Sequence, residues 1–278
     1  MVRGVISKDQ AARTCNRVWT YANQDPNDPE TWYGNGGIMI EMCLLRQISL
    51  LGVHGCPIDV SYRFGFGSGQ ETCSCGRYQS QEQWDNRQAP KIYEAFSQIW
   101  GQKELRVSRD RASINPPALD KAAALDSQVA FGLHFDTGFA QQRVAEAKKQ
   151  RPIPKGVQGV LYLVDTPAEN GAFICVPGMH RQVDNWLETL PDDVRPNDML
   201  KLKDESAAQT VLLGAKTKRI PAKAGDLIIW DTRLPHSAAS NVGDAPRVAQ
   251  YVCLLWRFNR QLGCHFLLTH ATGAGISQ

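Results

Sequence analysis

The spacing of apolar residues changes once along the chain, near residue 105, and this change constrains the fold more than any other feature. Before it, apolar residues recur at helical spacing in residues 8–21, 38–51 and 90–100. After it, short β-rich runs are separated by Gly, Pro and Asn, at residues 105–114, 129–135, 157–164, 172–176, 218–220, 227–230 and 248–258. Short strands with such punctuation are typical of a β-sandwich or barrel. We therefore expect a mainly β fold with flanking N-terminal α-helices.

A single domain is expected across residues 1–278, because neither an internal repeat nor a linker rich in Gly or Ser interrupts the sequence. Its helical N-terminal part would span about residues 1–104 and its β core about 105–260. Residues 186–190 and 198–202 would decorate a long insertion. Ser7 and Gln10 have capping-box spacing, which predicts a first helix from Lys8, and Gly101 ends the helix that begins at Pro90.

Composition excludes several classes of function. Lys plus Arg number 31 and Asp plus Glu 28, and no dense basic run occurs, so we expect no nucleic-acid partner. No apolar stretch reaches the length of a membrane helix, and residues 1–9 lack the apolar segment of a signal peptide. The 8 Cys are scattered in a chain large enough to fold without disulfides. We therefore expect a cytoplasmic protein with free thiols and no membrane contact.

A candidate metal site begins at His134 and Asp136, at the end of a predicted strand. Side chains two residues apart on a strand point to the same face, so both can reach one ion. A second imidazole would complete the two-histidine, one-carboxylate triad of non-heme Fe(II) oxygenases. His236 is the natural third ligand, because it follows the predicted strand 227–230 across a turn. A surface hydrogen-bonding pair of His134 and Asp136 is the alternative.

Arg247 lies eleven residues after His236, at the start of the apolar strand 248–258. A guanidinium binds a carboxylate through two parallel hydrogen bonds. An arginine behind the metal can therefore hold the far carboxylate of 2-oxoglutarate while the keto acid end of that molecule chelates iron. A surface ion pair with Asp231 or Asp244 is the alternative.

These residues lie within a longer resemblance. The sequence resembles the phytanoyl-CoA dioxygenase family of Fe(II)/2-oxoglutarate oxygenases in successive blocks at residues 134–136, 158–166, 169–173, 176–181, 224–227, 234–236 and 246–247. The resemblance implies a double-stranded β-helix (jelly roll), with His134, Asp136 and His236 on Fe(II) and Arg247 on the C5 carboxylate of 2-oxoglutarate. The position two after the distal histidine is often a small polar residue in relatives but is Ala238 here.

Further residues are candidates for the cosubstrate or substrate. Gln158 and Tyr162 share a face of one strand, and family position points that face at the cosubstrate, although plain barrel packing is the alternative. Arg109 and Arg111 share a face of the predicted strand 105–114 and could bind an anionic substrate group, the C1 end of 2-oxoglutarate or neighbouring carboxylates. We also expect Phe135 to contact the substrate. Residues 56–77, which are rich in Gly, would form a long loop that either covers the active site or lies simply on the surface.

The sequence therefore predicts an Fe(II)/2-oxoglutarate-dependent dioxygenase, with O₂ as second cosubstrate, that oxidises a small organic molecule in specialised metabolism. Hydroxylation, desaturation and oxidative cyclisation all remain open. Halogenating relatives replace the carboxylate ligand with a small residue, so Asp136 argues against halogenation. The alternatives are a jelly-roll binding protein without turnover and an acyl-CoA hydroxylase. Demethylation of nucleic acid or protein is disfavoured, because it would need a basic or elongated groove that the composition does not indicate.

Overall fold

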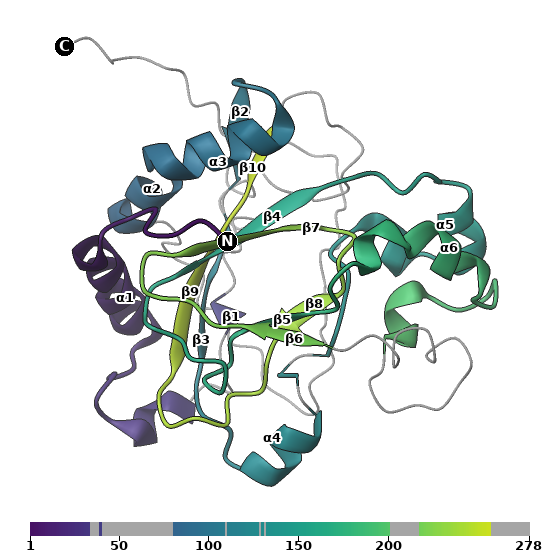
Figure 1. Cartoon of the computed structure of the whole chain (residues 1–278). Coiled ribbons are helices and arrows are strands. Elements are labelled where there is room, and N and C mark those ends of the chain that lie inside the picture. Colours follow the sequence, from purple (N-terminus) through teal and green to yellow (C-terminus); the bar gives the residue numbers. More distant parts are fainter. Residues whose placement is uncertain are drawn as a thin grey trace, which may run out of the picture.

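The computed structural model describes residues 1–33, 39–40, 80–108, 110–127, 129–130, 132–200 and 217–256, which Figure 1 draws in colour. The helices are α1 (Lys8–Ala22), η1 (Pro29–Tyr33), α2 (Gln81–Arg87), α3 (Pro90–Trp100), α4 (Lys121–Ser127), η3 (Gly138–Gln141), α5 (Val144–Lys148), η4 (Met179–Arg181), α6 (Val183–Glu188) and η5 (Pro196–Met199). The strands are β1 (Met39–Ile40), β2 (Leu105–Val107), β3 (Ala112–Asn115), β4 (Val157–Tyr162), β5 (Phe173–Cys175), β6 (Lys218–Ile220), β7 (Leu227–Asp231), β8 (His236–Ala238), β9 (Arg247–Val252) and β10 (Leu254–Trp256). Among these residues, no helix combines the length and the apolar character that crossing a membrane requires.

The strands form antiparallel sheets (Figure 1). The largest has five strands in the order β1-β3-β9-β4-β7, and a second has three in the order β6-β5-β8. A two-stranded sheet pairs β10 with β2. Neighbours in the sheets come from distant parts of the sequence, since β3 pairs with β9 and β5 with β8. The fold is therefore mainly antiparallel sheet with helices.

One face of the five-stranded sheet packs with the three-stranded sheet, and we call it the inner face. Directly opposite residues of antiparallel strands project from the same side. The register pairs Tyr162 of β4 with Ala249 of β9, and Gln158 of β4 with Trp230 of β7. The apolar side chains shared between the two sheets are Val160, Tyr162, Phe173, Cys175, Ala222, Ile228, Trp230 and Ala249. The apolar residues around the candidate site belong to this layer between the two sheets.

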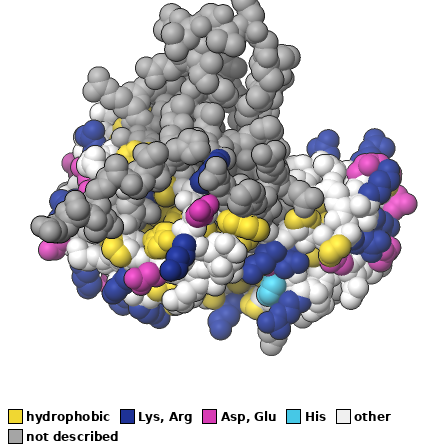
Figure 2. Space-filling model, turned by 90° about the horizontal axis from the view of Figure 1, so that it is seen from above, with side chains coloured by type: hydrophobic (Ala, Val, Ile, Leu, Met, Phe, Trp, Pro, Cys, Tyr) yellow, Lys and Arg dark blue, Asp and Glu magenta, His cyan; other side chains and the backbone are white. Residues whose placement is uncertain are grey.

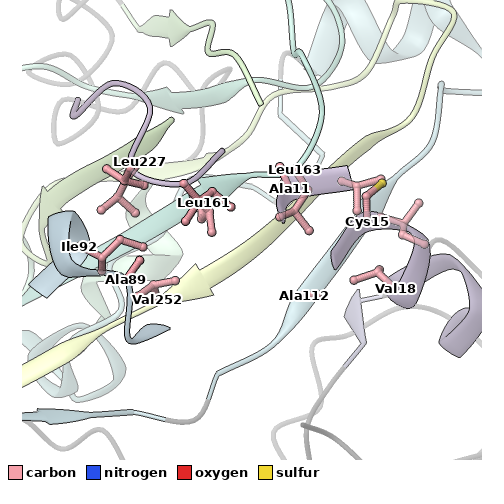
Figure 3. Packing of buried hydrophobic residues seen from close by; sticks show 14 of the residues in the cluster. Ala11, Cys15, Val18, Ala89, Ile92, Ala112, Leu161, Leu163, Leu227 and Val252 are labelled. Carbon is pink, nitrogen blue, oxygen red and sulfur yellow. The ribbon is translucent and has the colours of Figure 1, made fainter. Parts of the chain in front are cut away.

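The other face of the five-stranded sheet is covered by α1 and α3, as the packing in Figure 3 shows. Leu161, Leu227 and Val252 of the sheet contact helix residues in one continuous hydrophobic cluster. Gly159 allows this close packing, because a Cβ there would lie 2.9 Å from the carbonyl oxygen of Val252 and 3.3 Å from the ring of Phe96. The helices thus bury the outer face and leave the inner face for the site.

Two of the three predicted N-terminal helices are confirmed. Ser7 caps α1 by accepting a hydrogen bond from the backbone N–H of Gln10, at 3.1 Å. The Gln10 side chain does not complete the capping box but donates to Asn86 of α2 at 2.9 Å. α3 ends at Gly101, whose φ of 63° is left-handed. α2 was not predicted, because its seven residues are too few for a clear helical period.

Two predicted strands are each divided in two. The prediction of one strand over 105–114 is wrong, because β2 pairs with β10 whereas β3 pairs with β9. The break coincides with a break at Cys253 between β9 and β10. There, the backbone N–H and the hydroxyl of Ser108 both donate to the carbonyl oxygen of Cys253, each at 2.9 Å. The Ser108 hydroxyl therefore adds a second hydrogen bond at the point where both segments change sheet.

Two further expectations need correction. Residues 129–135 do not form a strand, because Gly132 adopts a φ of 75° and leaves isolated bridges at Val129 and His134. The predicted helix 38–51 is contradicted at its start, where Met39–Ile40 form β1. Its remainder lies outside the described residues, as do residues 257–258 of the last predicted strand, residues 201–202 of the segment 198–202 in the insertion and the predicted loop 56–77.

Candidate metal centre

His236 is the first residue of β8 and lies opposite Cys175 of β5. Its ring contacts those of Trp230 and Phe173, with centroids 4.8 and 5.6 Å away. Its Nδ1 lies 2.9 Å from the carbonyl oxygen of Leu234. Because a carbonyl can only accept, Nδ1 carries the proton and Nε2 keeps a free lone pair. The sheet thus presents Nε2 of a buried, oriented imidazole as a metal ligand.

His134 lies across an isolated antiparallel bridge from His236, with two backbone hydrogen bonds of 3.1 Å each. Its Nδ1 lies 3.1 Å from the carbonyl oxygen of Gly132, so its Nε2 is free by the same argument. The two imidazole centroids are 4.8 Å apart. The bridge therefore sets both imidazole rings side by side, although His134 comes from an irregular segment.

Asp136 completes the group. Its Oδ1 lies 3.5 Å from Nε2 of His134, and its Oδ2 lies 3.2 Å from Nε2 of His236. One ligand atom from each residue lies within 4.8 Å of the others. Two imidazoles and one carboxylate at this separation can surround a single divalent ion and leave positions open. The three predicted ligands therefore form a metal-binding triad.

Burial opposes charge at both His134 and Asp136. It lowers the pKa of His134, which favours the neutral imidazole that a metal requires. Burial also works against ionisation of Asp136, but His236 and His134 outweigh it and hold the pKa of this carboxyl below its ordinary value. At neutral pH the centre offers His134 and Asp136 in the charge states that bind a divalent cation.

Arg247 begins β9 on the inner face, opposite Asn115 of β3. Only 2% of it is exposed, and its Nε has no hydrogen-bond partner. Among the residues that the structure describes, no carboxylate forms an ion pair with its guanidinium. A guanidinium stays charged, and burying it without a counter-ion is costly. This position therefore suits an anionic ligand.

Tyr162 lies beside Arg247, with the guanidinium carbon 5.3 Å from its ring centroid. The Tyr162 hydroxyl accepts a hydrogen bond from the backbone N–H of Phe173 at 2.7 Å. Burial raises the pKa of Tyr162 despite the opposing charge of Arg247, so the phenol is neutral and its own proton can be donated. The inner face thus brings a cation and a hydroxyl donor together at one place.

Gln158 and Trp230 lie directly opposite each other on β4 and β7. The side-chain oxygen of Gln158 and the indole N–H of Trp230 are both buried and lack a hydrogen-bond partner among the described residues. Trp230 also contacts His236, which places this pair at the metal end of the inner face. Trp230 was not among the site residues predicted from the sequence. The signal was present, because the period of two along β7 puts Trp230 on the same face as the buried Ile228.

Arg111 lies next to β3 and near the triad. Its backbone carbonyl accepts from the N–H of Tyr251 at 2.8 Å, and its guanidinium carbon lies 5.6 Å from the Tyr251 ring centroid. After burial and the two histidines, the charge of Arg111 also contributes to lowering the pKa of Asp136. Arg111 is therefore close enough to the metal centre to act on it electrostatically. Arg109 lies outside the described residues.

The position of the Phe135 side chain contradicts the prediction that this residue contacts the substrate. Its side chain is fully buried and contacts Phe139 and Trp186, with ring centroids 5.1 and 5.7 Å away. These rings belong to a separate hydrophobic cluster that includes α6. The Phe135 ring lies in this cluster, whereas the side chains of His134 and Asp136 meet at the triad, so Phe135 faces away from the two ligands. Phe135 anchors the ligand segment in the core instead.

These observations define a protein of antiparallel sheets with a His-Asp-His metal-binding triad and a buried arginine on the same inner face. The model of the family described as Phytanoyl-CoA dioxygenase (PhyH) matches residues 63–249, more than half of the 278 residues. The chain belongs to this family.

Two curated relatives have similar sequences. A putative phytanoyl-CoA dioxygenase of Dictyostelium discoideum is 23% identical over 190 residues, which cover 60% of this chain and 52% of the relative. Ava biosynthesis cluster protein O of Aspergillus versicolor is 23% identical over 182 residues, which cover 62% of this chain and 53% of the relative. The chain thus spans about half the length of these relatives.

Among solved structures, HygX from Streptomyces hygroscopicus, crystallised with nickel and 2-oxoglutarate bound, matches with a TM-score of 0.52 at 12% identity. The match covers 92% of this chain and 82% of HygX. At this identity the likeness concerns the fold alone.

Proposed function

We propose that this chain is a non-heme Fe(II)/2-oxoglutarate-dependent dioxygenase that oxidises a small organic molecule. The observation that carries the proposal is the placement of the triad and of the buried Arg247 on one inner face, with no carboxylate partner for Arg247 among the described residues. Membership of the family supports it. We further propose that the two main sheets form a double-stranded β-helix within a single domain.

The residues present fit a divalent metal. His134, Asp136 and His236 would hold Fe(II), because each histidine is fixed with Nε2 free and the carboxylate lies between the two rings. The exposed fractions of the His134 and Asp136 side chains, 26% and 28%, leave one side of the centre accessible. Three protein ligands leave three positions for other donors.

The residues also fit 2-oxoglutarate. Arg247 would bind its C5 carboxylate, since the guanidinium is buried on the inner face without a carboxylate partner among the described residues. Tyr162 would donate its hydroxyl proton to the same carboxylate, and Gln158 would lie beside the cosubstrate nearer the metal. With O₂, Fe(II) and 2-oxoglutarate together supply oxidation of a C–H bond, with succinate and carbon dioxide as coproducts.

The chain itself contributes placement. The inner-face cluster of apolar side chains keeps water from the buried side of His236. We propose that Arg111, beside the triad, binds an anionic or strongly polar group of the substrate and so sets which C–H bond lies nearest the metal. Arg109 remains a second candidate for this contact.

The two curated relatives support two substrate classes. One relative is a protein of a fungal biosynthesis cluster, which supports a role in specialised metabolism. The other is a putative phytanoyl-CoA dioxygenase, so an acyl-CoA is the second candidate substrate. Hydroxylation, desaturation and oxidative ring closure are the outcomes that retain the Asp136 ligand.

The experiment is a screen of small organic acids, polyketide-like molecules and acyl-CoA esters for substrate-coupled succinate formation with Fe(II) and 2-oxoglutarate. We expect at least one compound to raise succinate release above the uncoupled rate, and we expect His236→Ala to abolish that increase. A binding protein without turnover would bind such compounds and release no succinate, in either the wild type or the variant.

A further inference from the structure

The backbone between the ligands His134 and Asp136 is not held by a regular strand. These two ligands flank Phe135 in a segment that is not a strand, and sheet pairing reaches it only through the isolated bridge between His134 and His236. A regular strand would hold such a segment by ladder hydrogen bonds on both sides. Another group must therefore orient the backbone between the two ligands.

The side chain of Asn197 provides this contact. The backbone N–H of Phe135 donates to Oδ1 of Asn197 at 2.8 Å, and Nδ2 of Asn197 donates to the carbonyl oxygen of Phe135 at 3.1 Å. A carboxamide has one acceptor and one donor side by side, as an extended backbone residue does. Because the Phe135 N–H needs an acceptor and the Phe135 carbonyl needs a donor, these two groups also fix which end of the Asn197 amide is oxygen. Asn197 thus acts as a one-residue strand partner for Phe135.

Asn197 is itself anchored on a packed element. It lies in η5 (Pro196–Met199), where Pro196 is buried. The adjacent Leu200 belongs to the same hydrophobic cluster as the Phe135 ring. Phe135 is therefore held at two places, its ring in the core and its backbone by the amide. With this residue fixed, the residues before and after it must both project from the opposite side.

We propose that Asn197 is a positioning residue of the metal centre, which holds the Phe135 backbone so that His134 and Asp136 face the same ion. The proposal rests on the proposed function only in that the triad binds a divalent metal. Asn197 is 62 residues from Phe135 in the sequence and contacts no ligand side chain in any described interaction. It acts through the ligand segment alone.

The test compares four proteins: wild type, Asn197→Ala, Asn197→Asp and Asp198→Ala. Asn197→Ala removes both hydrogen bonds. Asn197→Asp keeps an acceptor for the Phe135 N–H but loses the donor to its carbonyl. Asp198→Ala is the matched control, because Asp198 is the exposed neighbour on the same short helix. The readouts are Co(II) affinity by calorimetry, the visible absorption spectrum of bound Co(II), and the thermal unfolding of the metal-free proteins.

We expect Asn197→Ala to weaken Co(II) binding by roughly 10- to 100-fold, the usual effect of removing a group that orients metal ligands. The Co(II) spectrum should also change, since the ligand geometry is loosened. Asn197→Asp should lie between Asn197→Ala and wild type, and Asp198→Ala should match wild type. A Co(II) affinity of Asn197→Ala within twofold of wild type, with an unchanged spectrum, would overturn the proposal.

Two further outcomes are also decisive. If Asn197→Ala fails to fold, Asn197→Asp carries the test, and wild-type Co(II) affinity and spectrum in that variant would overturn the proposal. If wild type binds Co(II) but never releases succinate from 2-oxoglutarate, the proposed function fails while the comparison of Co(II) affinities still decides the role of Asn197. Absence of Co(II) binding by wild type would overturn both.

Discussion

The two histidines of the triad are held by different kinds of structure. His236 starts a regular strand, its side chain is 6% exposed, and the rings of Trp230 and Phe173 enclose it. His134 lies in an irregular segment after a left-handed Gly132, and its side chain is 26% exposed. One ligand is part of the packing between sheets, whereas the other is placed by a few polar contacts.

This difference separates two properties that a metal site combines. Residues around His236 contribute to the packing of the inner face, so changing them should alter both stability and the site. His134 itself lies outside the hydrophobic clusters of the described residues, although its neighbours Leu133 and Phe135 are buried in one, so changing His134 should alter metal affinity with little effect on the fold. Variants on the two sides of the site should therefore separate effects on stability from effects on metal affinity.

The largest expected effect is loss of a ligand. His134→Ala and His236→Ala each leave two of three donors, so both should abolish binding of Fe(II). Without metal they should differ. His236→Ala should lower the free energy of unfolding by roughly 2 kcal/mol, because a buried ring and its hydrogen bond are lost. His134→Ala should lower it by less than about 0.5 kcal/mol. Chemical denaturation of the metal-free variants measures both changes in the free energy of unfolding. Equal destabilisation would contradict the difference between the two histidines.

The next effect concerns the cosubstrate end of the inner face. Arg247→Leu should weaken 2-oxoglutarate binding by roughly 100-fold and Tyr162→Phe by roughly 10-fold, because each removes a charge-assisted hydrogen bond to the C5 carboxylate. Metal affinity should remain. The measurement is calorimetry on the Co(II)-loaded proteins, with 2-oxopentanoate as the control ligand, since it has the same chain length and no C5 carboxylate. A loss of affinity for both ligands alike would show that the variants act on structure.

Ala238 offers a rescue of Tyr162→Phe. Ala238 pairs with Phe173, the residue whose N–H donates to the Tyr162 hydroxyl. Ala238→Ser would add a hydroxyl beside Phe173. In the Tyr162→Phe background we expect it to recover part of the 2-oxoglutarate affinity, and unchanged affinity in the double variant would argue that a hydroxyl at position 238 does not reach the C5 carboxylate.

A smaller effect should separate stability from metal affinity at two glycines. Gly132 and Gly101 have φ of 75° and 63°, and a Cβ at either would meet no atom within 4 Å. Alanine should therefore cost about 1 kcal/mol of stability at each, through backbone strain alone. Only Gly132→Ala should also weaken Co(II) binding, by up to roughly tenfold, because the Gly132 carbonyl orients His134. Equal metal affinity in both variants would contradict the comparison.

The smallest effect is a pH dependence at the start of β7. Burial works against ionisation of Asp226, but the N–H groups of Lys223 and Gly4 and the Arg3 guanidinium outweigh it and hold its pKa below the ordinary value of 3.8. Since the folded pKa is the lower one, the carboxylate stabilises the fold above pH 3.8, and this is lost as pH falls through the folded pKa. Asp226→Asn should cost about 1 kcal/mol at neutral pH and leave metal affinity unchanged. Denaturation between acidic and neutral pH should show a flatter dependence for the variant, and an identical slope would exclude this role.

The ligands could be predicted from the sequence because their spacing is local. His134 and Asp136 are two positions apart, with only Phe135 between them, and a turn after an apolar strand precedes His236. Alternation along an extended segment also places Phe135 on the side opposite His134 and Asp136, so the sequence already argued against a contact of Phe135 with the substrate. α1 and α3 were predictable from their apolar period and from Ser7 and Gly101.

The groups that support the ligands could not be predicted. Asn197 reaches Phe135 from a short helix in an irregular region, and no periodic pattern marks an asparagine that bonds to a distant backbone. At the change of sheet between β2 and β3, the Ser108 hydroxyl bonds Cys253, which is 145 residues away in the sequence. Such contacts follow from tertiary packing, which local propensity does not encode.

The most direct measurement is a calorimetric titration of 2-oxoglutarate into the protein with and without Co(II), repeated with Arg247→Leu. The account predicts binding of one 2-oxoglutarate per chain that requires the metal and is strongly weakened in the variant. Binding of equal strength without metal, or no binding with metal present, would contradict the assignment of the triad and Arg247 to one cosubstrate site.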